Sequence, residues 1–192
     1  FIGSPAMNLM MGTVTRTGDE LALQLGSQTV RLPESVLQTR PALADYLDQR
    51  VVVGVRPEDL DDAAVGSNAV GSNAVLPDNS RPVLHAVADL IEPLGSDLIV
   101  HLSVDAEPVQ SNDDLTELAK DVGHPDAGAP QSSDASTTLV ARFNPRSTVA
   151  IGEPVHVRID TQRLHYFDPG TGLGVWTAEP EQRAQFNSRE DT

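Results

Sequence analysis

RVVVGVRPEDL, residues 50–60, is the stretch on which the fold of this chain depends. Its valines are β-branched and stiff at χ1, which favours an extended backbone. They occupy both faces of the pleat, which predicts a strand buried on two sides. Pro57 ends the strand because it lacks an N–H donor and forces Arg56 toward extended geometry. Gly54 inside the run predicts a bend, a bulge or a close backbone approach.

Short strands separated by Gly and Pro turns are predicted on both sides of this stretch. Before it, three strands form a meander, and residues 34–48 form one or two short helical turns interrupted by Pro41. After it, six further strands are expected. The predicted strands are residues 12–17, 21–25, 28–32, 50–56, 82–92, 98–104, 138–143, 154–160, 164–167 and 172–176. This pattern predicts an all-β fold with minor helix, built as small β-barrels or a β-sandwich.

Composition limits the kind of core and the chemistry of this chain. Its 192 residues suffice for one domain or two small ones. Hydrophobic residues make up 39% but aromatics only 4%, so the core is expected to consist mainly of Val, Leu, Ala and Ile. The chain contains no Cys, which excludes disulfides, thiolate metal sites and cysteine nucleophiles.

The charge of the chain argues against two classes of partner. A formal net charge of −15 disfavours nucleic acid and anionic membrane surfaces, because both require a basic face. Part of the acid excess lies in a polar insertion, residues 105–137, which is predicted to be solvated. The loop 61–82 carries the pentapeptide VGSNA twice in succession, which is typical of a tolerant surface loop.

No catalytic motif is found in the sequence. There is no Walker A run, no GxSxG, no HExxH and no EF-hand loop. None of the five histidines has metal-ligand spacing to another: His85, His101, His124, His156 and His165. We therefore expect no catalytic residue, cofactor or metal in this segment. The turn Gly95-Ser96-Asp97 is explained equally well as a hairpin turn or as a polar turn that binds an anion or a partner.

Four motifs occur in an order that resembles a known family. FIGSPAMN at residues 1–8 resembles the junction after an ATPase domain, and GVRPEDL at 54–60 resembles G-[VI]-R-P-E-x-[LI]. Residues 87–97, VADLIEPLGSD, resemble V-x-x-x-E-x-L-G-x-[DE] with one additional residue in the first gap. Residues 163–172, RLHYFDPGTG, resemble a terminal strand of the form xLHxFDxxTG. The family is the ATP-binding subunits of sugar-importing ABC transporters of the maltose and glycerol-phosphate type.

This resemblance implies a fold of tandem oligonucleotide-binding (OB)-like barrels of the TOBE type, whose first and last strands close together. Residues 1–11 would be the junction from a missing ATP-binding domain, and 12–60 the first barrel half. Residues 83–176 would form the second barrel and the closing strands, followed by a polar tail at 177–192. The insertion and VAIGEPV at residues 149–155 resemble actinobacterial members, including trehalose importers.

The resemblance also implies a role. The segment would be the regulatory and dimerisation domain of a carbohydrate importer's ATP-binding subunit, with ATP and Mg²⁺ bound only elsewhere in the parent protein. Its partners would be a second copy, its own nucleotide-binding domain and the membrane permease, at the cytoplasmic face of the plasma membrane. The candidate inter-domain contacts are Arg56, Glu58, Gly95, Ser96 and Asp97.

The sequence is compatible with two other functions. Related barrels in oxyanion importers bind their anion in this module, so the chain is alternatively a sensor of a small ligand or oxyanion. With only 13 Lys and Arg, its composition argues against anions, although a backbone nest could still hold one. A secreted carbohydrate-binding β-domain also fits the composition, but the chain lacks the surface aromatics that stack on sugars.

Overall fold

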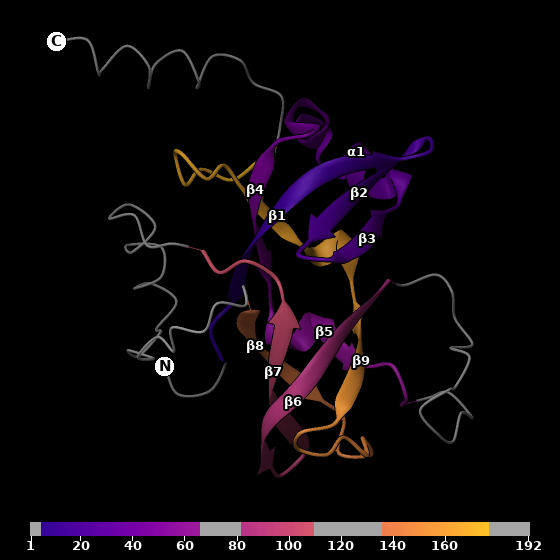
Figure 1. Cartoon of the computed structure of the whole chain (residues 1–192), viewed down its shortest axis with the longest axis vertical. Helices are drawn as coiled ribbons and strands as arrows, with labels where there is room; N and C mark the ends of the chain where they lie inside the picture. The colour runs from indigo at the N-terminus through magenta and orange to yellow at the C-terminus, as the bar shows by residue number, and fades with distance from the viewer. Residues whose placement is uncertain (1–4, 66–81, 110–135, 177–192) are drawn as a thin grey trace, which may run out of the picture.

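The computed structural model describes residues 5–65, 82–109 and 136–176. Within them the chain forms two antiparallel five-stranded sheets, which occupy the upper and lower parts of Figure 1. The first sheet has the order β10-β4-β1-β2-β3, and the second β5-β9-β6-β7-β8. The prediction of an all-β fold with little helix is therefore confirmed. The predictions for the VGSNA repeat, for most of the acidic insertion and for the polar tail concern residues outside the described ranges.

The first sheet is built from the meander and two later strands. Its members are β1 (Asn8–Thr17), β2 (Glu20–Leu25), β3 (Gln28–Leu32), β4 (Arg50–Val55) and β10 (His165–Phe167). Between β3 and β4 lie α1 (Glu34–Thr39) and the 3₁₀ helix η1 (Pro41–Tyr46). Pro41 stands at the start of η1, where its missing N–H costs nothing. The predicted pair of short helical turns is thus confirmed.

Strand β4 is the buried centre that its valines predict. Residues 51–55 are all buried, and β4 pairs with β1 on one side and with β10 on the other. Gly54 is the position of a close approach: a Cβ atom there would lie 2.9 Å from Met7 Sδ and 3.2 Å from the Phe167 ring. In β2 and β3 the predicted alternation places Leu23 against Val30 in the core.

The second sheet curls into a small barrel. Its strands are β5 (Leu60–Asp62), β6 (Val83–Leu94), β7 (Asp97–Asp105), β8 (Ser136–Phe143) and β9 (Pro154–Ile159). Its edge strand β8 packs against β5, at the opposite edge, and against the 3₁₀ helix η2 (Pro57–Asp59). Val100, Leu102 and Phe143 are fully buried inside this curl. The barrel closes through side chains at this seam, where no β8–β5 ladder is formed.

Four local predictions differ from the structure. Strand β1 begins at Asn8, not Gly12, because its first residues pair with Val55 at the end of β4. The sequence predicts a loop from residue 61, where the structure has the short strand β5. The last strand, β10, pairs with β4 rather than closing against β1, whose two edges are already occupied by β4 and β2. The strand predicted at residues 172–176 is reduced to one β-bridge, between Phe167 and Gly174. Its first residues belong instead to the turn that is closed by the hydrogen bond from Asp168 N–H to the Leu173 oxygen.

Candidate functional site

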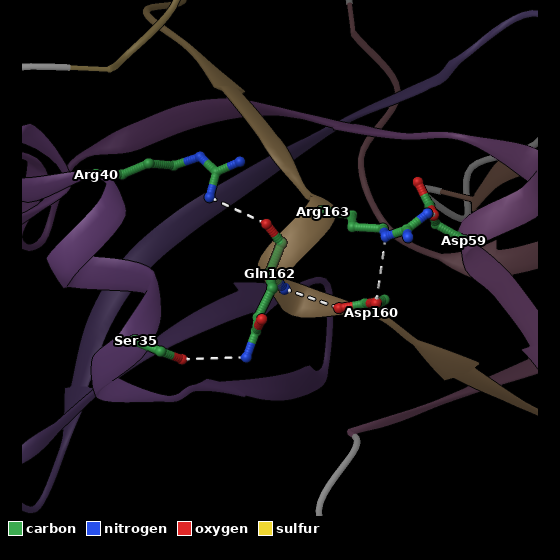
Figure 2. A network of polar contacts seen from close by, with 6 residues as sticks. All are labelled: Ser35, Arg40, Asp59, Asp160, Gln162 and Arg163. Atoms are coloured by element: carbon green, nitrogen blue, oxygen red, sulfur yellow. Dashed lines mark hydrogen bonds and ion pairs between the residues drawn. The ribbon is translucent and has the colours of Figure 1, made fainter.

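The candidate site is the junction between the two sheets. Each sheet contains one strand from the other half of the chain: β10 lies in the first sheet and β5 in the second. The connection from β9 to β10 is the 3₁₀ helix η3 (Thr161–Arg163), which crosses from the second sheet to the first. Asp160 begins the turn, because its Oδ1 accepts the Gln162 backbone N–H at 3.1 Å. Figure 2 shows this turn and its contacts with both halves of the chain.

Gln162 attaches the turn to the helical segment of the first half. Its backbone oxygen accepts a hydrogen bond from Arg40 Nη1 at 3.1 Å, and its Nε2 donates to Ser35 Oγ at 3.3 Å (Figure 2). Arg163 attaches the same turn to η2, with Nη1 3.0 Å from Asp59 Oδ1. The hydrogen bond to Asp59 raises the pKa of Arg163 above its ordinary value. One short turn therefore holds two helices from a distant part of the sequence.

Arg40 is the most unusual cation of this junction, because it is 7% exposed and forms no ion pair among the described residues. Its guanidinium carbon lies 5.8 Å from the centre of the Tyr166 ring and 5.4 Å from that of Trp176. Arg40 Nε and the Tyr166 hydroxyl are both buried without a hydrogen-bond partner. Burial raises the pKa of Tyr166 despite the opposing charge of Arg40.

His165 extends this cluster toward solvent. Its ring meets the Trp176 ring edge-on, with centroids 5.9 Å apart. Burial lowers the pKa of His165 below its usual 6.5, and the positive charges of Arg56 and Arg40 lower it further. His165 is therefore neutral at physiological pH.

A second part of the junction is formed by the turn between β2 and β3. The Ser27 N–H and hydroxyl both donate to Asp105 Oδ2 at the end of β7, and these bonds lower the pKa of Asp105. The Gln28 side chain donates to the His85 carbonyl oxygen at 3.0 Å and accepts the His85 N–H at 2.7 Å. Gln28 thus satisfies both backbone groups of one residue in β6, as a neighbouring strand would.

Asn8 forms the third part, at the edge of the second sheet. Its Nδ2 donates to the carbonyl oxygens of Val55 at 3.1 Å and Val140 at 2.9 Å, and its Oδ1 accepts the Val140 N–H at 2.6 Å. The amide therefore joins the end of β4 to the free edge of β8. Sequence reasoning missed both Asn8 and Gln28, because an amide that joins two sheets looks the same in a sequence as an amide that faces solvent.

The residues predicted to form inter-domain contacts lie in two different parts of the structure. Asp97 is ion-paired with Arg142 at 2.8 Å and accepts the Ser96 hydroxyl at 2.9 Å, in a hairpin turn where Gly95 has φ 59°. The bond to Asp97 raises the pKa of Arg142, and the charge of Glu58 contributes. Glu58 and Asp97 therefore both act on Arg142. Arg56 lies instead near His165, whose pKa it lowers. Their role as inter-domain contacts stays a prediction.

Metal-binding clusters and membrane-spanning helices are both absent from the described residues. Within residues 5–65, 82–109 and 136–176, no three His, Asp or Glu side chains are grouped so that they could hold a metal ion. The helices in these ranges are all too short to cross a membrane. The arrangement is one of structural hydrogen bonds between two sheets.

Comparison with known proteins agrees with this architecture. Residues 3–60 match the family described as the MalK OB fold domain. The first part of the chain thus resembles the OB-fold domain of MalK-type proteins.

Curated relatives extend the match to most of the chain. The trehalose import ATP-binding protein SugC of Mycobacterium tuberculosis is 33% identical over 177 residues, 91% of this chain and 39% of the relative. The trehalose/maltose import ATP-binding protein MalK of Thermococcus litoralis is 29% identical over 92% of this chain and 36% of the relative. The sn-glycerol-3-phosphate import ATP-binding protein UgpC 2 of Agrobacterium fabrum is 26% identical over 96% and 35%. These matches confirm the resemblance to ATP-binding subunits of sugar importers, of which the chain spans less than half the length.

Proposed function

We propose that this chain is the regulatory and dimerisation domain of the ATP-binding subunit of a bacterial carbohydrate importer. The domain itself carries no catalytic residue, and the parent protein binds and hydrolyses ATP with Mg²⁺. The similarity to the mycobacterial trehalose importer subunit favours trehalose as the transported sugar. The parent would act at the cytoplasmic face of the membrane, bound to its permease.

The observation that supports this proposal most directly is the exchange of strands between the two sheets. Because β10 joins the first sheet and β5 the second, the sheets cannot separate without breaking ladder hydrogen bonds. A rigid two-sheet body is suited to a mechanical role. By pairing with its copy it would keep two ATPase domains at high effective concentration while they open and close.

The test compares the full-length subunit with a truncated variant that lacks this chain and ends at the residue before Phe1. Sedimentation of both in the absence of nucleotide measures the contribution of this domain to dimerisation. We expect the full-length subunit to dimerise at least tenfold more tightly, since a tethered second contact raises avidity by about 10²–10⁴. Equal dimerisation of both proteins would contradict the proposal. Trehalose uptake by a strain that lacks the subunit, with and without complementation, tests the sugar.

Anion sensing is a second candidate, and Arg40 is the observation that favours it. A buried arginine with an unpartnered Nε beside an unpartnered Tyr166 hydroxyl is a potential partner for an oxyanion. Calorimetric titration with molybdate, sulfate and phosphate, on the wild type and on Arg40→Met, tests this function. Heat signals that are lost in the variant would support it, and flat titrations would exclude it for these anions.

A further inference from the structure

The outer face of β6 contains a local irregularity that regular strand geometry does not require. Leu84, Ala86 and Ala88 alternate into the core, so Leu90 would be the next buried residue. A β-bulge between Ala88 and Leu90 interrupts this alternation. Leu90 then pairs with His101 on the outer face and is 44% exposed, whereas Ile91 turns inward opposite Val100. The bulge coincides with the additional residue by which VADLIEPLGSD departs from the family motif.

Leu90 has apolar neighbours on the same surface. Val87, which faces outward opposite Ser103 in β7, is 38% exposed. Ile151 is 61% exposed in the segment before β9, and this segment is fixed to β6 because Gly152 N–H donates to the Ala88 oxygen at 2.7 Å. Exposing three large apolar side chains together costs hydration free energy, so an apolar surface of this kind is typical of an interaction site.

Acidic residues surround these apolar side chains. Asp89 occupies the bulge and accepts the Ser103 hydroxyl at 2.6 Å, and Glu92 lies 3.6 Å from His101. Glu153 is exposed beside the same strand and accepts the Ala88 N–H through its backbone oxygen. Strands β6 and β7 and residues 149–155 contain no Lys or Arg. We call Val87, Leu90, Ile151, Asp89, Glu92 and Glu153 together the acidic β6 surface.

A groove of about 670 Å³ continues this surface toward the first sheet. Val87 and Ser103 lie at their common boundary, and the groove is further lined by His85, by Asp105 and by the turn at residues 27–29. Asp105 is the one charged residue in the lining. The surface and the groove therefore present apolar side chains and carboxylates together.

We propose that the acidic β6 surface binds an amphipathic segment of a partner protein that carries Lys or Arg beside its apolar residues. The apolar residues would cover Val87, Leu90 and Ile151, and the cations would face the surrounding carboxylates and the groove. Charge complementarity selects this occupant. A second copy of the chain bound through this same surface would bring Asp89, Glu92 and Glu153 face to face with their counterparts. The chain's own insertion is also unsuitable, since residues 110–135 contain six acidic residues and one Lys.

The test uses a fluorescein-labelled amphipathic helix of Leu and Lys, about 18 residues or five turns long, and fluorescence anisotropy with the 192-residue chain. We expect binding in the micromolar range that weakens in high salt. A helix of the same pattern with Glu in place of Lys is the charge control and is expected not to bind.

Matched variants locate the contact. Leu90→Ser is expected to weaken binding about five- to tenfold, because a Leu side chain is no longer buried by the peptide. Leu173→Ser is the control, since Leu173 is 49% exposed in the segment after β10 and lies outside the acidic β6 surface. The double variant Glu92→Gln and Glu153→Gln is expected to reduce both affinity and salt dependence. Unchanged melting temperatures verify that the variants remain folded.

Three results of the peptide titrations, and one result of a sedimentation experiment, would each overturn the proposal. The first is that the Leu/Lys helix does not bind. The second is that Leu90→Ser and Leu173→Ser lower the affinity for this helix equally. The third is that the Leu/Glu helix binds as tightly as the Leu/Lys helix. Sedimentation of the chain alone is run in parallel. Self-association that Leu90→Ser abolishes would assign this surface to a second copy and contradict a cationic partner. This proposal does not depend on the dimerisation role, so either can fail without the other.

Discussion

Asn8 offers the sharpest test of how the two sheets are joined. Replacing it with Ala removes three hydrogen bonds, two to carbonyl oxygens and one from the Val140 N–H. A net hydrogen bond contributes about 1 kcal/mol, and a buried donor left without a partner costs about 1–3 kcal/mol. Because Asn8 is only 7% exposed, water cannot fully replace the amide. We therefore expect Asn8→Ala to lower the free energy of unfolding by about 2–4 kcal/mol.

The assay is urea unfolding followed by circular dichroism, at equal protein concentration and pH 7. Asn144→Ala is the control, because Asn144 makes one side-chain bond, to the Arg146 N–H at 2.9 Å, on an exposed loop. This control is expected to lose less than about 1 kcal/mol. Equal losses for the two variants would refute the reasoning that the amide of Asn8 joins the sheets.

Asn8→Asp separates the donor from the acceptor function of the amide. An ionised carboxylate can accept the Val140 N–H but cannot donate to the two carbonyl oxygens, so the ionised form is disfavoured in the fold. The folded pKa of the introduced carboxyl is then raised, and its contribution to stability is present at low pH and lost as pH rises through that pKa. We expect the deficit relative to wild type to be smaller at pH 4 than at pH 7. A deficit that does not change with pH would contradict this account.

Two further predictions concern glycine and histidine positions. Gly26→Ala should lower the free energy of unfolding by more than about 2 kcal/mol, because its Cβ would clash with the backbone oxygen of Asp105. Gly18→Ala, also at positive φ but in open space, should lower it by about 1 kcal/mol. Similar unfolding midpoints for the two variants would contradict the clash at Gly26. Trp176 is the only tryptophan, so its fluorescence should report protonation of His165 with a midpoint below 6.5, and His165→Gln should remove this transition. Since the folded pKa of His165 is lowered, its contribution to stability is full above pH 6.5 and is lost as pH falls below it.

The local chemistry of the sequence determined the elements of this fold. The β-branched Val51, Val52, Val53 and Val55 predict the buried strand β4, and Pro57 predicts its end, because both effects act within a few bonds. The alternation of Leu21, Leu23 and Leu25 likewise predicts a half-buried strand. The family motifs extended these local predictions to an OB-like fold, which the match of residues 3–60 confirms.

The pairing of the strands and the burial of individual polar side chains were decided only by the tertiary structure. That β10 joins β4, and that β5 joins β9, depends on contacts between residues about a hundred positions apart, for which the sequence has no local signal. The same is true of Asn8, Gln28 and Arg40, since an amide or guanidinium acquires its role from groups that the fold places beside it. The bulge at Asp89 depends on both the local sequence and the tertiary structure. The additional residue is visible in the sequence, but only the register with β7 determines that Leu90, and not Ile91, faces solvent.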